Sequence, residues 1–86
     1  MSNPQILSQL KPQDGWAEVL GFTADGALKD LLMSFGVIPG VRLKCVGHVP
    51  GSSSLILDFE SWQGALREDE AAIVKIAKVQ TTKENA

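Results

Sequence analysis

Apolar and polar residues alternate along several short segments of the chain, which is the pattern of strands that bury one face. The clearest alternation covers residues 41–46 and 54–59. Residues 16–22 and 73–79 are mostly apolar and rich in aromatic or β-branched residues, which also favours strands. A tight connection after the second alternating segment leads to residues 62–66, and the two segments form a predicted hairpin. The residues that we expect to point inward from these strands are Val41, Leu43, Cys45, Leu55, Leu57, Phe59, Val74 and Ile76.

The period of the pattern changes between residues 25 and 35. Leu28, Leu31, Leu32 and Phe35 recur there at the spacing i, i+3, i+4 and i+7. This spacing stacks the four side chains on one side of a helix. The sequence therefore predicts one helix over residues 25–35.

Turn and helix-end signals divide the rest of the chain. Gly36 can adopt a positive φ after the last helical turn, and Pro39 with Gly40 fits a type II turn that reverses the chain. Three acidic residues begin the segment 67–72, where the helix dipole favours them, so a short helical turn is predicted. Residues 6–10 fit either a short strand or a helical turn.

This order of elements indicates a mainly β fold. A strand, a helix, three strands, a short helical turn and a last strand form a small, partly open barrel of about five strands. The length of 86 residues, with 44% hydrophobic and 21% charged residues, is typical of one domain. We expect that domain to cover residues 7–79 and a flexible polar tail to cover residues 80–86.

Charge and hydropathy argue against nucleic-acid and membrane partners. Eight basic residues stand against ten acidic ones, and they are scattered, so no basic stripe could neutralise a run of phosphates. The longest uncharged stretches, residues 31–41 and 46–57, are shorter than the roughly 18 apolar residues that span a bilayer. The first residues lack the pattern of an export signal, and one cysteine cannot form an internal disulfide, so we expect a cytoplasmic location.

Cys45 and His48 are the only soft metal-ligand types in the chain. On a regular strand their odd separation places the two side chains on opposite faces, unless a bulge near Gly47 intervenes. A complete site would need two further ligands, such as Asp58 or Glu60. We therefore interpret Cys45 as a buried structural residue and His48 as an exposed loop residue, and predict no metal site.

Catalytic constellations are also weak. The serines at 52–54 fit a loop better than a nucleophile beside a base, and the acidic residues at 58–60 and 68–70 fit a wet strand face and a helix start. The glycines form no phosphate-binding fingerprint. We predict no catalytic residue, no cofactor and no enzyme activity.

A docking surface remains as the candidate functional feature. Met33 falls outside the helical stripe, and Trp62 lies at a hairpin end where an indole is hard to bury. Both side chains fit either exposed anchors or fillers of a small core. The interpretation that we adopt is a protein-contact patch formed by Leu32, Met33, Val49, Pro50 and Trp62.

The order and spacing of several short motifs resemble the FeoA family. Residues 36–40 (Gly-Val-Ile-Pro-Gly) follow the apolar helix, and a strand, a proline-containing loop and a hairpin come next. Residues 65–67 (Ala-Leu-Arg) are then followed by Ala71 and by a closing strand over residues 73–76. Each motif alone is weak, whereas their order over about residues 7–79 is moderately specific.

The resemblance implies an SH3-like barrel in a small cytosolic accessory protein of ferrous iron uptake. Such a protein would bind the cytoplasmic part of a FeoB-type membrane GTPase transporter and modulate its assembly or activity, and the nucleotide would belong to the partner. A similar domain is appended to iron- and manganese-responsive repressors. The alternative is therefore a metal-responsive regulatory domain that acts by homo-oligomerisation or by binding a repressor.

Overall fold

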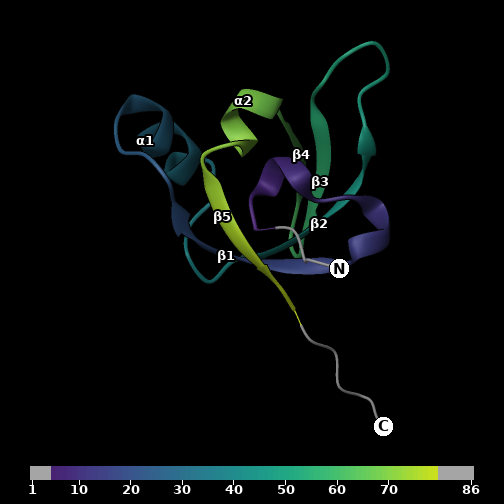
Figure 1. The fold of residues 1–86 in the computed structure, drawn as a ribbon, viewed down its shortest axis with the longest axis horizontal. Helices are drawn as coiled ribbons and strands as arrows, with labels where there is room; N and C mark the ends of the chain where they lie inside the picture. The colour runs from purple at the N-terminus through teal and green to yellow at the C-terminus, as the bar shows by residue number, and fades with distance from the viewer. Residues whose placement is uncertain (1–4, 80–86) are drawn as a thin grey trace, which may run out of the picture.

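The computed structural model describes residues 5–79, so the predicted tail at 80–86 lies outside the described residues. Strands dominate this part of the chain, with two short α-helices and two 3₁₀ turns between them (Figure 1). In chain order the elements are η1 (Leu7–Gln9), η2 (Pro12–Asp14), β1 (Trp16–Phe22), α1 (Ala27–Ser34), β2 (Arg42–His48), β3 (Leu55–Phe59), β4 (Gln63–Leu66), α2 (Glu68–Ala71) and β5 (Val74–Lys78).

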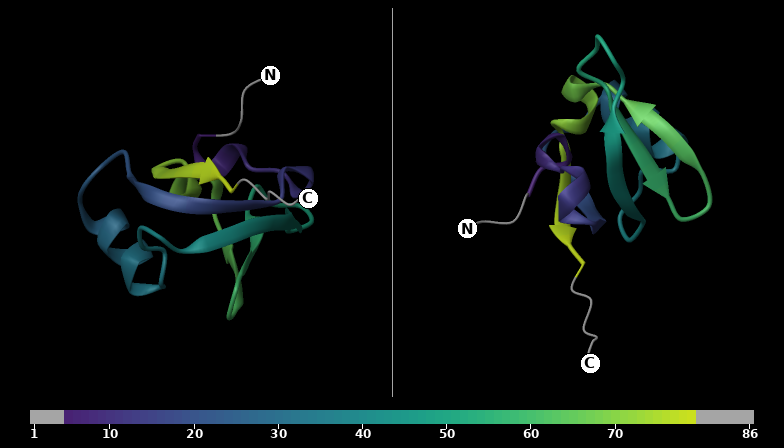
Figure 2. Two further views of the ribbon diagram at one scale, coloured as in Figure 1. Left: turned by 90° about the horizontal axis from the view of Figure 1, so that it is seen from below. Right: turned by 90° about the vertical axis from the view of Figure 1, so that its right-hand side faces the viewer.

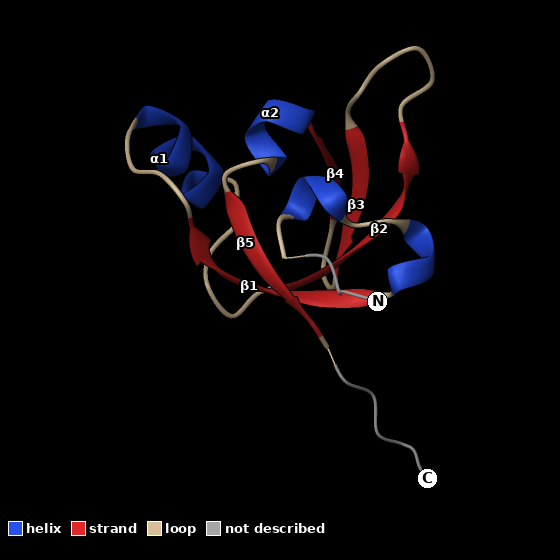
Figure 3. Ribbon diagram, viewed as in Figure 1, coloured by secondary structure: helices blue, strands red, loops and turns tan. Residues whose placement is uncertain are grey.

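The five strands form one antiparallel sheet with the order β4-β3-β2-β1-β5. The sheet curls around a single core, with α1 and α2 at one side of it (Figure 3). In the part of the chain that the structure describes, β4 and β5 do not pair, so the barrel stays open between them. The prediction of a mainly β, partly open barrel is confirmed, including the helix between the first two strands and the helical turn before the last.

The period-two patterns predicted the core well. Seven of the eight residues expected to face inward are buried, and the eighth, Val41, is partly buried and packs against them. Within residues 6–10, which fitted two interpretations, residues 7–9 form the 3₁₀ turn η1. Leu7 in this turn and Leu10 just after it are 0% and 1% exposed. This N-terminal turn therefore supplies part of the core.

The helix α1 is shorter than predicted, because it runs from Ala27 to Ser34 and not from residue 25 to residue 35. Its last turn ends in a Schellman motif. Val37 N–H donates to the Leu32 carbonyl over 3.0 Å, Gly36 N–H donates to the Met33 carbonyl over 3.0 Å, and Gly36 has the positive φ of 98° that was expected. Leu32 and Val37, which such a motif brings together, are both 0% exposed.

The predicted apolar stripe of α1 does not face the core as a unit. Leu32 is buried and Leu28 packs partly against the core, whereas Leu31 and Phe35 are 44% and 50% exposed. Periodicity shows which side chains share a side of a helix, but it does not fix how that side is oriented. The Schellman pairing of Leu32 with Val37 sets the orientation here, and Phe35 is left at the surface.

Candidate functional site

Trp62 stands at the end of the hairpin between β3 and β4. Phe59 N–H donates to the Trp62 carbonyl over 2.7 Å, and Trp62 N–H donates to the Phe59 carbonyl over 3.3 Å. The two rings stack, with centroids 4.2 Å apart and an interplanar angle of 5°. Phe59 is buried and Trp62 is 41% exposed. The indole thus rests on the core with part of its surface in solvent.

Two glycines leave room for the Trp62 ring. A Cβ atom on Gly64, in the edge strand β4, would overlap the indole carbon Cζ3. A Cβ atom on Gly36, at the end of α1, would lie 3.8 Å from the ring, which is ordinary van der Waals contact. Trp62 therefore lies against β4 and close to the end of α1. The close approach at Gly64 explains a glycine inside a strand.

An open apolar pocket of about 310 Å³ lies around this ring. The pocket lies between the edge strand β4 and the C-terminal end of α1. We name it the seam pocket. Its lining residues are Phe35, Phe59, Trp62, Gly64, Ala65 and Leu66.

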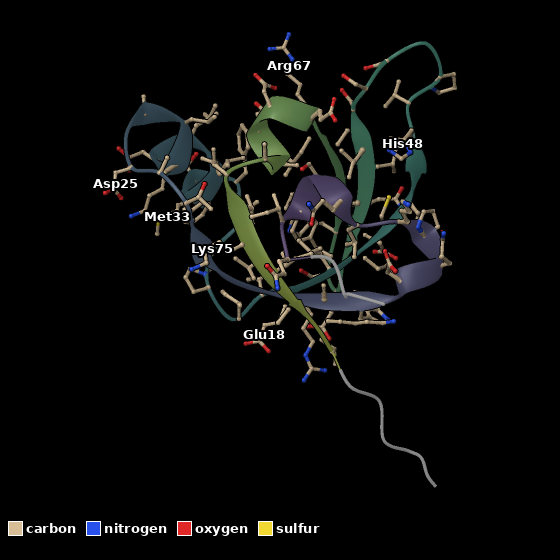
Figure 4. All side chains as sticks on the ribbon, viewed as in Figure 1. Glu18, Asp25, Met33, His48, Arg67 and Lys75 are labelled. Carbon is tan, nitrogen blue, oxygen red and sulfur yellow. The ribbon has the colours of Figure 1, made fainter. Side chains whose placement is uncertain are left out.

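The structure separates the residues of the predicted contact patch. Leu32 is 0% exposed, so it belongs to the core and has no surface to offer a partner. Met33 is 39% exposed on α1, and Trp62 lines the seam pocket. Val49 and Pro50 lie in the loop between β2 and β3, at the other end of the molecule from α1 (Figure 1). Their neighbour His48 and the side chain of Met33 are likewise on opposite sides (Figure 4).

Sequence reasoning missed the other half of the seam pocket. Phe35 was assigned to the helical stripe, and Gly64 and Ala65 were assigned to the hairpin. A glycine inside a short strand, two residues after a tryptophan, was a usable signal for close packing of a ring. The position of Phe35 beside the seam pocket depends on how α1 packs against the sheet. No local sequence pattern determines this packing.

The structure contains the bulge near Gly47 that the argument about Cys45 and His48 allowed for. The strand β2 continues to His48, and its pairing with β3 shifts register between Cys45 and Gly47. Cys45 is opposite Leu57 and His48 is opposite Leu55, so the bulge puts both on the same face of the sheet. Cys45 is nonetheless 1% exposed, and His48 is exposed.

No group of three or more His, Cys, Asp or Glu residues within 5–79 is arranged to hold a metal ion. In the β2–β3 loop, the Ser52 hydroxyl oxygen accepts from Ser54 N–H and pairs with the Ser54 hydroxyl, both over 3.1 Å. These contacts fit the predicted turn role of the serines. Among the described elements, no helix has the length and apolar character needed to cross a bilayer.

Replacing Gly64 by alanine is expected to expel the Trp62 ring from its position. The added methyl group would overlap the indole, and the partly exposed ring can move outward more easily than the strand backbone can. The variant should lose the stacking with Phe59, which is worth about 0.5 to 1.5 kcal/mol. Tryptophan fluorescence should shift to the red and become more accessible to iodide.

A Gly21→Ala variant is the matched control, because a Cβ atom at Gly21 would meet no atom within 4 Å. Its fluorescence should stay that of the unmodified protein. An unchanged spectrum for Gly64→Ala would show that the ring does not lie against β4 in solution.

Comparison with known proteins shows which family and which solved structures this chain resembles. Residues 7–78 match the family model described as the FeoA domain. A FeoA protein from Chlorobium tepidum, solved by NMR, superposes with a TM-score of 0.75 at 24% identity, over 92% of this chain and 74% of that one. No curated protein sequence matches.

Two further solved structures share the fold. Zinc-complexed FeoA of Stenotrophomonas maltophilia, described as an SH3 domain protein, has a TM-score of 0.67 at 23% identity, over 86% of this chain and 91% of that one. ScaR with bound Cd²⁺ has a TM-score of 0.73 at 15% identity, over 90% of this chain and 37% of that one. The barrel is thus SH3-like, and the family match covers nearly all of the described residues. The chain belongs to the FeoA family.

Proposed function

We propose that this protein is a cytoplasmic accessory module that binds the cytoplasmic part of a FeoB-type GTPase transporter and modulates its assembly or activity. The observation that carries the proposal is an exposed aromatic site on a FeoA-family barrel. Phe35 and Trp62 are 50% and 41% exposed, and they line one pocket. Half-exposed aromatic side chains beside a pocket are typical anchors of protein interfaces.

The seam pocket suits a protein partner better than a chemical step. Its six lining residues carry no ionisable side chain. General acid–base and nucleophilic catalysis need such groups within hydrogen-bond reach of a substrate. The pocket is also at the lower end of the volumes typical of small-molecule sites, about 300 to 1,000 Å³. We infer that the pocket receives one side chain of a partner.

A module of this kind regulates by differential affinity. It can shift the transporter between two conformations only as far as it binds one more tightly, and a tenfold affinity ratio corresponds to about 1.4 kcal/mol. Nucleotide chemistry stays with the transporter. The expected result is therefore a dissociation constant that changes with the nucleotide state of the partner.

Calorimetric titration tests this proposal, with the transporter's soluble GTPase domain and with the intact transporter in detergent. Each is measured with GDP and with a non-hydrolysable GTP analogue. We expect saturable binding that is tighter in one nucleotide state. Absence of binding to both preparations in both states would contradict the proposal.

Phe35→Ser should weaken this binding by about tenfold or more, because it removes an exposed aromatic wall of the seam pocket. Leu20→Ser is the matched control, since Leu20 is 52% exposed on β1 and does not line the pocket. The control should bind like the unmodified protein. Equal weakening by both substitutions would place the contact elsewhere.

The regulatory alternative receives little support. ScaR shares the fold at 15% identity, which is a likeness of fold alone. The alternative would be favoured by ferrous iron binding that changes the oligomeric state, measured by light scattering with and without Fe²⁺. Without such a change, the transporter-binding module is the better explanation.

A further inference from the structure

We infer that the edge of β4 is a peptide-docking site, at which an extended segment of a protein partner adds as a sixth strand and inserts one large apolar side chain into the seam pocket. Lys or Arg residues flank that side chain. The inference rests on the proposed function in one respect, because it takes the partner to be a protein. It adds the mode of docking and the chemistry of the docked segment.

The two edges of the sheet differ. The outer edge of β5 is covered by the N-terminal segment, where Ile6 pairs with Lys75 and Ile76 N–H donates to the Gln5 carbonyl over 2.9 Å. Within residues 5–79, no backbone group pairs with the outer edge of β4. Figure 2 (right) shows β4 as the outermost strand on its side of the sheet. A free edge of this kind is a template for another strand.

The register with β3 shows which groups of β4 are free. Phe59 and Trp62 exchange both backbone hydrogen bonds. Because such pairs alternate along an antiparallel ladder, Gly64 and Leu66 also direct their backbone groups toward β3. Gln63 and Ala65 occupy the intervening positions, so their N–H and C=O groups point away from the sheet.

These free groups and the seam pocket are next to each other. An added strand would hydrogen-bond to Gln63 and Ala65. The partner residue opposite Gly64 would then point to the inner face, because directly paired residues share a face of the sheet. Gly64 itself presents no side chain, and Trp62 and Phe35 line the space beside it. One side chain of the docked strand therefore enters the seam pocket.

Charge selects the occupant. Three exposed acidic residues flank β4, Glu60 before it and Glu68 and Asp69 after it, and Arg67 is the exposed basic residue beside them in the sequence. A segment with Lys or Arg on either side of its apolar residue complements these ends. A second copy of this chain does not, because antiparallel pairing of two β4 edges, with Gly64 opposite Gly64, would bring Glu60 of one copy toward Glu68 of the other. The occupant is thus a basic and apolar segment of a different protein.

Peptide selection on the isolated chain tests this docking mode. A display library of random peptides of about ten residues, long enough for one strand, is selected on the immobilised protein. We expect the selected sequences to combine one large apolar residue with flanking Lys or Arg. Each peptide is then synthesised with single N-methylated amides at successive positions, and its affinity is measured by fluorescence anisotropy.

Strand pairing predicts a specific pattern in the affinities of the N-methylated peptides. Methylation at alternate positions should weaken binding by about tenfold or more, since only every second amide faces β4. The positions between them should change little. Failure to select any peptide, or a methylation series without a period of two, would overturn the docking mode.

Two substitutions at Ala65 test the same strand pairing by changing this protein instead of the peptide. Ala65→Pro removes the outward N–H from an edge strand, where proline is tolerated, and should weaken the selected peptides by about tenfold. Ala65→Ser keeps the N–H and is the comparison, so it should weaken binding less than Ala65→Pro does. Equal affinity for both variants would count against pairing at β4, and circular dichroism checks that both are folded.

The peptide measurements and the transporter titration test separate claims, so either one can fail without the other. If the transporter does not bind but the peptides show the period of two, the docking mode stands and the identity of the partner is wrong. If the transporter binds but the peptides fail, the proposed function stands and the docking mode is wrong.

Discussion

Replacing Leu32 by alanine is expected to lower the free energy of unfolding by about 2 to 5 kcal/mol. Leu32 is the one residue of α1 that is fully buried, and its carbonyl accepts the Val37 N–H of the Schellman motif. Truncation would leave a cavity at the point where α1 is attached to the barrel. A domain of this size has a total stability of about 5 to 10 kcal/mol, so the loss is a large fraction of it.

Urea unfolding followed by far-UV circular dichroism measures this effect. Met33→Ala is the matched control, because Met33 is the next residue of the same helix and is 39% exposed. Its stability should change by no more than about 0.5 kcal/mol. A similar loss for both variants would show that α1 is not attached through Leu32.

The contrast between these neighbours shows what the sequence could and could not predict. In β3, a period of two leaves only two choices, and the apolar set formed by Leu55, Leu57 and Phe59 decides between them. In an eight-residue helix at the rim of a barrel, several orientations bury some apolar side chain. The orientation of α1 was set instead by its contact through Leu32 and Val37.

The candidate site was half predictable for a related reason. Trp62 was recognised as a poor fit to the interior, because the hairpin turn beside it is a local feature. In the structure, the Trp62 ring lies close to both Gly36, at the end of α1, and Gly64, in β4, and these two glycines are far apart in the sequence. Such a juxtaposition comes from the curvature of the sheet. The predicted patch grouped Val49 and Pro50 with Met33, and the structure places them at opposite ends of the molecule, because loop composition carries no information about which loops meet.

The bulge in β2 gives the same lesson at a smaller scale. Alternation predicted that Leu43 and Cys45 point inward, and the possible bulge near Gly47 is present as a register shift. His48 is exposed as predicted, but it belongs to β2 and not to the loop. Gly47 has a φ of 156°, near the boundary of the region that favours glycine. A glycine inside an alternating strand was the available warning.

Replacing Trp62 by alanine is expected to cause the largest loss of partner binding, about 30-fold or more, which corresponds to about 2 kcal/mol. The indole is already held by stacking on Phe59, so a partner that contacts it pays little conformational entropy to order it. Its removal would also strip one wall from the seam pocket beside the free edge of β4. Binding is measured by titration with the transporter preparations and with the selected peptides.

The second tryptophan supplies the control that separates binding from folding. Trp16 lies on β1 with the Lys44 ammonium 5.0 Å from its ring centroid, and it does not line the seam pocket. Trp16→Ala should leave the dissociation constant within about threefold of the original, less than 1 kcal/mol. Trp62→Phe should recover part of the lost affinity, because it keeps an aromatic ring against Phe59. If both alanine variants weaken binding equally, or Trp62→Ala does not weaken it, then the partner does not use the seam pocket.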